Sequence, residues 1–119
     1  MQYLALLYST EEARPDPDRP DFPEVMAAYR RVTADLTEKN ALLGANPLQP
    51  VATATSVRLR DGEVLATDGP FAETKERLGG YYLLECESLD HAIEMAAQIP
   101  AASYGTVELR PIMPIPAPE

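Results

Sequence analysis

The stretch from Thr67 to Glu76, with the sequence TDGPFAETKE, holds the densest set of side chains that could do chemistry. Asp68 offers a carboxylate that could act as a general base in a partly closed cleft. Phe71 could stack on a ligand, and Glu73 and Lys75 could hold a polar substrate. Loops held by a rigid scaffold often carry binding residues. This stretch and the strands beside it are therefore the first candidate site.

Each of these residues also has a structural interpretation. The carboxylate of Asp68 could accept backbone N–H bonds in an Asx-type turn ahead of the Gly-Pro pair, which is the interpretation that we favour. Phe71 could anchor the loop to the core or to a partner. Glu73 and Lys75 could form a solvated pair, which would contribute little to stability. The sequence leaves these alternatives open.

Tyrosine hydroxyls supply a second candidate set. Four tyrosines could line a pocket between the predicted sheet and the first helix, although a buried tyrosine more often serves as core with one partner for its hydroxyl. Arg58, on a predicted hairpin, could bind an anionic group or pair with an acid. The four tyrosines are Tyr8, Tyr29, Tyr81 and Tyr82.

The histidine and cysteine counts argue against a metal centre. The chain has one histidine, His91, and one cysteine, Cys86, whereas zinc, copper and iron sites usually need several imidazole or thiolate ligands. We expect His91 at the surface of a helix and Cys86 as an inert buried thiol. A single cysteine fits a reducing, cytoplasmic environment. The sequence indicates no metal and no cofactor.

Length and charge narrow the class of protein. The 119 residues fit one domain, and the net charge of −9 argues against a nucleic-acid binder, which needs a basic face. No apolar run approaches the roughly 20 residues of a membrane helix, and no basic region opens the chain, so we expect neither a membrane span nor a signal peptide. We predict a domain over residues 1–112 and a flexible, proline-rich tail over 113–119.

The elements that must position the candidate residues follow the order β-α-β-β-β-α-β. Asp61-Gly62 is the favoured pair for a two-residue hairpin turn, and it would place Arg60 opposite Glu63. Residues 40–50 contain glycine and prolines and are expected to be an irregular connection. The predicted elements are a strand at 2–8, a helix at 21–40, a hairpin at 53–67, a strand at 81–86, a helix beginning after Ser88, and a strand at 106–112.

If one strand of the hairpin is treated as an addition, the remaining order is the split βαβ, or ferredoxin-like, α+β pattern. In this pattern two helices cover one face of an antiparallel sheet. An apolar set is left for the opposite face. An uncovered apolar face predicts association, most economically a twofold homodimer with the sheets face to face. We assign to this face Tyr3, Ala5, Leu7, Tyr81 and Leu83.

The stretch Thr67–Glu76, followed by Gly79–Tyr82, resembles the signature of the YCII-related, or DGPF-domain, proteins. The resemblance covers nearly the whole chain. It also includes Tyr3–Tyr8, Met26–Tyr29, Leu48–Pro50, Ile99–Ala102 and Glu108–Pro111.

The resemblance implies ferredoxin-like subunits that pair as a dimeric α+β barrel in bacterial, cytoplasmic proteins, mostly without an assigned biochemical role. It also implies a sigma factor of the extracytoplasmic-function type as a candidate partner, because such genes are often neighbours. Some wider relatives carry a His/Asp pair in lyase-like chemistry. Here the only histidine, His91, lies in the second predicted helix, so that pair does not transfer.

Three functions remain in view. The first, which we favour, is a small dimeric binding or accessory protein that senses a small-molecule ligand or contacts a regulatory partner. The second is a cofactor-independent enzyme that uses Asp68 and tyrosine hydroxyls for lyase- or isomerase-like proton transfer on a small organic acid or phenol. The third is a structural dimer in which the DGPF loop (residues 68–76) stabilises the interface.

Overall fold

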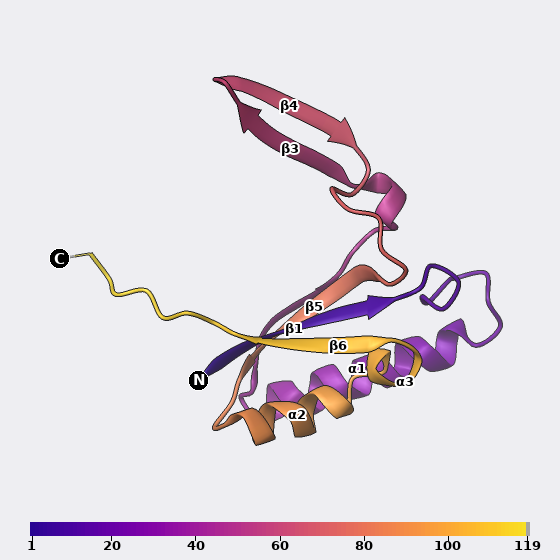
Figure 1. Cartoon of the computed structure of the whole chain (residues 1–119). Coiled ribbons are helices and arrows are strands. Elements are labelled where there is room, and N and C mark those ends of the chain that lie inside the picture. Colours follow the sequence, from indigo (N-terminus) through magenta and orange to yellow (C-terminus); the bar gives the residue numbers. More distant parts are fainter. Residues whose placement is uncertain (119) are drawn as a thin grey trace.

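The computed structural model describes residues 1–118 and shows a ferredoxin-like α+β fold (Figure 1). Its main sheet has four antiparallel strands in the order β2-β5-β1-β6, so the first strand lies inside the sheet. The strands are β1 (Gln2–Ser9), β2 (Leu42–Pro47), β5 (Arg77–Glu85) and β6 (Thr106–Pro111).

Helices cover one face of this sheet only (Figure 1). They are α1 (Phe22–Glu38), α2 (Leu89–Ala97) and the short α3 (Ala101–Tyr104), while a 3-10 turn, η1 (Val51–Thr53), follows β2. The core lies between the helices and the sheet. Its largest fully buried side chains are Leu36, Leu84 and Ile99.

The residues at the helix ends differ in whether their side chains make capping hydrogen bonds. Ser88 caps α2 as predicted, because its hydroxyl accepts a hydrogen bond from the His91 amide at 3.1 Å. Asp21 stands at the start of α1, but its side chain makes no capping hydrogen bond. Asn40 follows the end of α1 with φ at 58°, a left-handed conformation that asparagine tolerates, and it turns the chain into β2.

Residues 42–47 form β2, although an irregular connection was predicted there. Gly44 lies at an irregularity in the register with β5, and Pro47 closes the strand. Glycine and proline are depleted in strands, but an edge strand tolerates a proline because one side of its backbone needs no partner. The fourth strand of the main sheet therefore comes from this segment and not from the hairpin.

The hairpin is a separate two-stranded sheet, β3 (Thr55–Arg60) and β4 (Glu63–Asp68). Its predicted register is confirmed, since Arg60 pairs with Glu63 and both turn residues, Asp61 and Gly62, have positive φ. Figure 1 shows it standing clear of the main sheet, on the side away from the helices. The expectation that it supplies a strand to the main sheet was wrong.

Only part of the residue set predicted for the sheet face without helices lies on that face. Tyr3, Ala5 and Leu7 are buried beneath the helices, so their assignment to the open face was wrong. The register pairs Leu4 with Leu83 and Leu6 with Tyr81, and these residues occupy the opposite, open face. We call Leu4, Leu6, Tyr81 and Leu83 the open sheet face.

Residues 112–118 form neither helix nor strand. Met113 and Ile115 are 79% and 84% exposed. Glu119, the last residue of the predicted tail, lies outside the described residues.

Candidate ligand-binding site

A cavity of about 960 Å³ lies between the sheet and α1, which lines it from Phe22 to Ala34. Small-molecule sites commonly have volumes of about 300–1,000 Å³. Its walls come from α1, from the ends of β1, β2 and β5, from α3, and from the loop that joins β1 to α1. Most of the lining side chains are apolar, such as Leu7, Phe22, Met26, Pro47 and Leu48.

Tyrosine hydroxyls provide polar groups in this apolar wall. Tyr29 of α1 and Tyr104 of α3 form a hydroxyl–hydroxyl hydrogen bond, although 75 residues separate them in the chain. Beside them, the hydroxyl of Tyr82 on β5 lies 3.2 Å from the hydroxyl of Thr33 on α1. All four residues line the cavity. The site can therefore exchange hydrogen bonds with a ligand at two neighbouring points.

The two paired phenols remain neutral well above physiological pH. Burial is the main cause that raises the pKa of Tyr29 above its ordinary value, and the hydrogen bond to Tyr104 raises it further. Burial also raises the pKa of Tyr104, while its hydrogen bond with Tyr29 and the charge of Arg14 act in the opposite direction. These hydroxyls suit hydrogen bonding to a ligand better than proton abstraction.

The raised pKa values predict how stability changes at high pH. The folded state holds these phenol protons more tightly than the unfolded chain, so this stabilisation is present below the ordinary pKa of 10.0 and is lost as the pH rises above it. Urea unfolding between pH 9 and 11 should show a falling free energy of unfolding, with a shallower fall in Tyr29→Phe. The control is Tyr81→Phe, on the open sheet face. Equal pH dependence in all three proteins would contradict the assignment.

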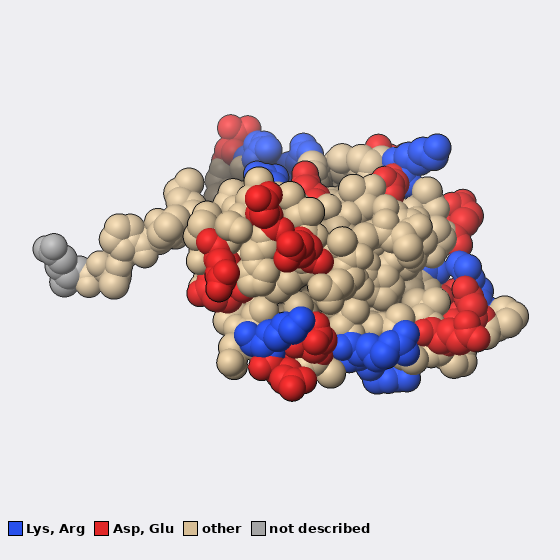
Figure 2. Space-filling view, turned by 90° about the horizontal axis from the view of Figure 1, so that it is seen from below, with Lys and Arg blue, Asp and Glu red and all other residues tan. Residues whose placement is uncertain are grey.

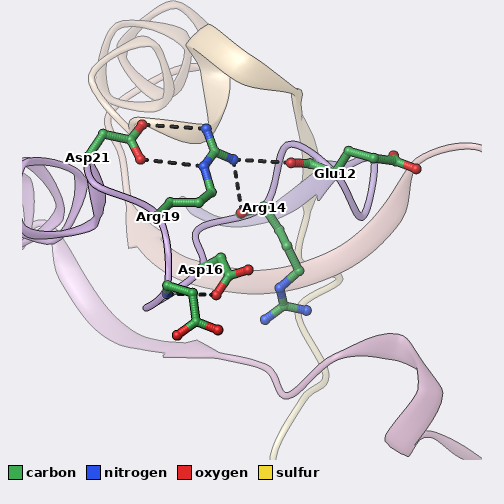
Figure 3. Close-up of polar contacts among 6 residues, drawn as sticks. Glu12, Arg14, Asp16, Arg19 and Asp21 are labelled. Atoms are coloured by element: carbon green, nitrogen blue, oxygen red, sulfur yellow. Dashed lines mark hydrogen bonds and ion pairs between the residues drawn. The ribbon is translucent and has the colours of Figure 1, made fainter.

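The loop from residue 10 to 21 forms one wall and is held by an arginine. Arg19 binds the carboxylate of Asp21 at 3.4 Å and donates to the Glu12 carbonyl at 3.1 Å, as Figure 3 shows. The Asp18 amide also donates to the Asp16 carboxylate at 2.9 Å. These contacts give the proline-rich segment a defined course beside the cavity.

Arg14 leaves the same loop in a different direction from Arg19 (Figure 3). Its guanidinium donates to the Leu48 carbonyl at 3.0 Å, so it links the loop to the segment after β2. Within residues 1–118, no ion pair joins Arg14 to an acid. Arg14 and Arg30 are the two charged residues that line the cavity.

The predicted site residues fall into two separate places. Three of the predicted tyrosines, Tyr8, Tyr29 and Tyr82, border the cavity between α1 and the sheet. The other predicted residues are absent from its lining. They are Tyr81 on the open sheet face, Arg58 and Asp68 on the hairpin, and Phe71, Glu73 and Lys75 in the loop between β4 and β5.

The DGPF loop is fastened to the hairpin through its backbone. The Gly69 amide donates to the Ala54 carbonyl at 2.7 Å, and the Ser56 hydroxyl donates to the Gly69 carbonyl at 2.8 Å. Among the described residues, no hydrogen bond reaches the Asp68 carboxylate, which is exposed. Phe71 is 81% exposed. The loop therefore presents its side chains outward.

Sequence reasoning missed part of the cavity wall. Arg14 lies in a proline-rich loop, and Tyr104 lies in a segment predicted to be a turn. Phe22 and Met26 belong to the apolar stripe of the first helix, and both remain partly exposed beside the cavity. The sequence signal for this part of the wall was the apolar stripe of the first helix. That stripe extends to Phe22, whereas the buried core beneath the helix lies near its end, at Leu36.

The described residues contain no group of three or more His, Cys, Asp or Glu side chains that could hold a metal ion. In the same part of the chain, none of the helices combines the length and apolar character that crossing a membrane requires.

The fold and the cavity define a ferredoxin-like α+β protein with a large, mainly apolar space between helix and sheet. The family model of the YCII-related domain matches residues 1–116. An uncharacterized protein of Rhizobium meliloti (strain 1021) is 36% identical over 114 residues, which cover 94% of this chain and 92% of that relative. The chain belongs to the YCII-related family.

Proposed function

We propose that the protein is a small homodimeric binding protein, whose cavity between α1 and the sheet takes a small organic ligand. The observation that carries the proposal is the unfilled apolar stripe of α1. Only Leu36, near the end of that helix, is buried, while Phe22 and Met26 in its first half stay partly exposed around about 960 Å³ of space. A ligand there would remove this apolar surface from water.

Filling the cavity tests the proposal. Ala34 is an exposed residue of α1 that borders the cavity, so Ala34→Phe should reduce the space without loss of buried contacts. Thermal-shift screening of small acids, phenols and nucleotides should find compounds that stabilise the wild-type protein, because binding to the folded state raises its stability. We expect the shift to fall by at least half in Ala34→Phe.

The matched control is Ala102→Phe, which makes the same change at an exposed position of α3 outside the cavity. It should keep the full ligand-induced shift. Equal shifts in both variants would place the binding elsewhere, and a screen without any stabilising compound would count against a small-molecule function.

The homodimer is proposed from exposed apolar surface. The open sheet face carries Leu4, Leu6 and Leu83 without a helix over them. An apolar face of this kind is rarely left to water in a monomer, and a twofold axis lets one patch cover its own copy.

The hairpin supports the same proposal. Val57, Leu59 and Val64 lie on one face of it and are 66%, 64% and 71% exposed. An isolated two-stranded hairpin is marginally stable in water, so this face also needs a cover. The hairpin stands on the open side of the main sheet in Figure 1, where a second subunit would meet it.

Two finer parts of the proposal rest on the family resemblance alone. These are a bacterial, cytoplasmic setting and a regulatory contact with a sigma factor of the extracytoplasmic-function type. Copurification of the tagged protein with a sigma factor of this type from the cells that produce both tests the contact directly.

The enzyme alternative has weaker support. It needs Asp68 to share a pocket with tyrosine hydroxyls, but Asp68 ends β4 on the hairpin and does not line the cavity. The phenols of Tyr29 and Tyr104 also have raised pKa values, which makes them poor bases near neutral pH.

A further inference from the structure

We infer that the ligand is an organic acid with an apolar body, whose carboxylate binds the guanidinium of Arg14. This inference rests on the proposed function, because it names the chemical class that the same cavity would accept. The charged side chains that line the cavity carry the inference.

The charged residues that line the cavity are basic, whereas the whole chain is acidic. The sequence has 19 Asp and Glu residues against 10 Lys and Arg. The described lining nevertheless includes two arginines, Arg14 and Arg30, and no acidic residue. On the helix-covered surface in Figure 2, by contrast, Lys and Arg lie beside Asp and Glu along the edges. A cavity free of carboxylates favours an anion over a cation or a zwitterion.

Arg14 is held in place but retains unused donors. Its contact with the Leu48 carbonyl, at 3.0 Å, is the one hydrogen bond of this side chain among the described residues. A guanidinium carries five N–H donors in a planar fork that fits a carboxylate with two parallel hydrogen bonds. The other donors of Arg14 are therefore available, and the loop that carries it is fixed separately by Arg19.

Polar and apolar groups are arranged for such a molecule. Arg14 lines the same cavity as the hydrogen-bonded pair Tyr29 and Tyr104, and its charge lowers the pKa of Tyr104. Neutral phenols can donate hydrogen bonds to a carboxylate. Phe22 and Met26 offer apolar surface for the rest of the ligand. The head of the acid would then lie at the loop and its body along α1.

Paired ligands test the charge directly. The probes are 3-phenylpropanoate, naphthalene-2-acetate and decanoate, each measured by isothermal titration calorimetry against the primary amide of the same skeleton at pH 7.5. A charge-assisted hydrogen bond is roughly twice as strong as a neutral one, so the best acid should bind at least about tenfold more tightly than its amide. Arg14→Gln should bring that ratio close to one, and Arg14→Lys should restore part of it.

The control is Arg110→Gln, which removes an exposed arginine of β6 outside the cavity and should keep the preference for the acid. Acids and amides that bind equally would overturn the inference while leaving the cavity a binding site. A preference that survives Arg14→Gln would overturn the role of Arg14. Absence of binding by every acid and amide would count against the proposed function as well. Thermal unfolding of each variant identifies a loss of fold.

Discussion

Leu6→Arg is expected to be a folded monomer, whereas the wild-type protein is expected to be a homodimer. Leu6 lies on the central strand β1, in the middle of the open sheet face. In the proposed dimer, each subunit would place a longer, charged side chain in an apolar interface, and removing that charge from water is costly. In the monomer, the new arginine lies opposite Glu108 of β6, which favours its folded state.

Light scattering coupled to size-exclusion chromatography measures this effect. Ile93→Arg is the matched control, since it makes a comparable apolar-to-basic change at a half-exposed position of α2, on the other side of the sheet. We expect the dissociation constant of the homodimer to rise by at least about a hundredfold in Leu6→Arg and to change little in Ile93→Arg. A wild-type monomer, or a Leu6→Arg dimer of unchanged affinity, would contradict the face-to-face dimer.

Gly105→Ala is expected to be the most destabilising small substitution in the main fold. Gly105 joins α3 to β6 beside the end of β1, just before Thr106 pairs with Tyr8. A Cβ at this position would overlap the carbonyl oxygen of Tyr8 and would lie 3.0 Å from the Cβ of Ser9. Because these neighbours belong to a central strand, they cannot move aside cheaply. Overpacking of this kind costs about 1–3 kcal/mol of unfolding free energy, and occasionally more.

Urea unfolding of Gly105→Ala and Gly44→Ala measures the difference. Gly44 belongs to the edge strand β2, and no atom lies within 4 Å of a Cβ built there. Gly44→Ala should therefore change stability by less than about 1 kcal/mol. Similar stability of the two variants would contradict close packing of Gly105 against the end of β1.

Local signals predicted the elements that depend on local chemistry. The pair Asp61-Gly62 gave the hairpin turn and its register, and Ser88 gave the start of α2. β2 was missed because Gly44 and Pro47 oppose strand formation locally, while pairing with β5 supplies the stabilisation. A segment of that kind is recognised only when its partner strand is known.

The open sheet face shows a different limit. Strand β1 is apolar on both sides, so alternation separates Leu4 and Leu6 from Tyr3 and Ala5 without telling which pair the helices cover. The cross-strand register settles the question, because Tyr3 pairs with the buried Leu84. Pairing of distant strands is a tertiary property that no single segment reveals.

The candidate site was partly within reach of the sequence. A pocket between the sheet and the first helix followed from the tyrosines, and Tyr29 and Tyr82 do border such a cavity. Arg14 and Tyr104 could not be placed there, because a loop and a short helix far apart in the chain bring them together. The functional roles of Asp68 and its loop remain predictions.

A nuclear magnetic resonance titration of the 15N-labelled protein with the tightest-binding acid of the paired panel tests directly whether the cavity binds the ligand. Saturable amide shifts should gather around the cavity, at Tyr29, Thr33, Leu48 and Gly80, with little change in residues 68–76. Shifts confined to the DGPF loop would move the site to residues 68–76. No saturable shift would contradict a ligand-binding role for the cavity.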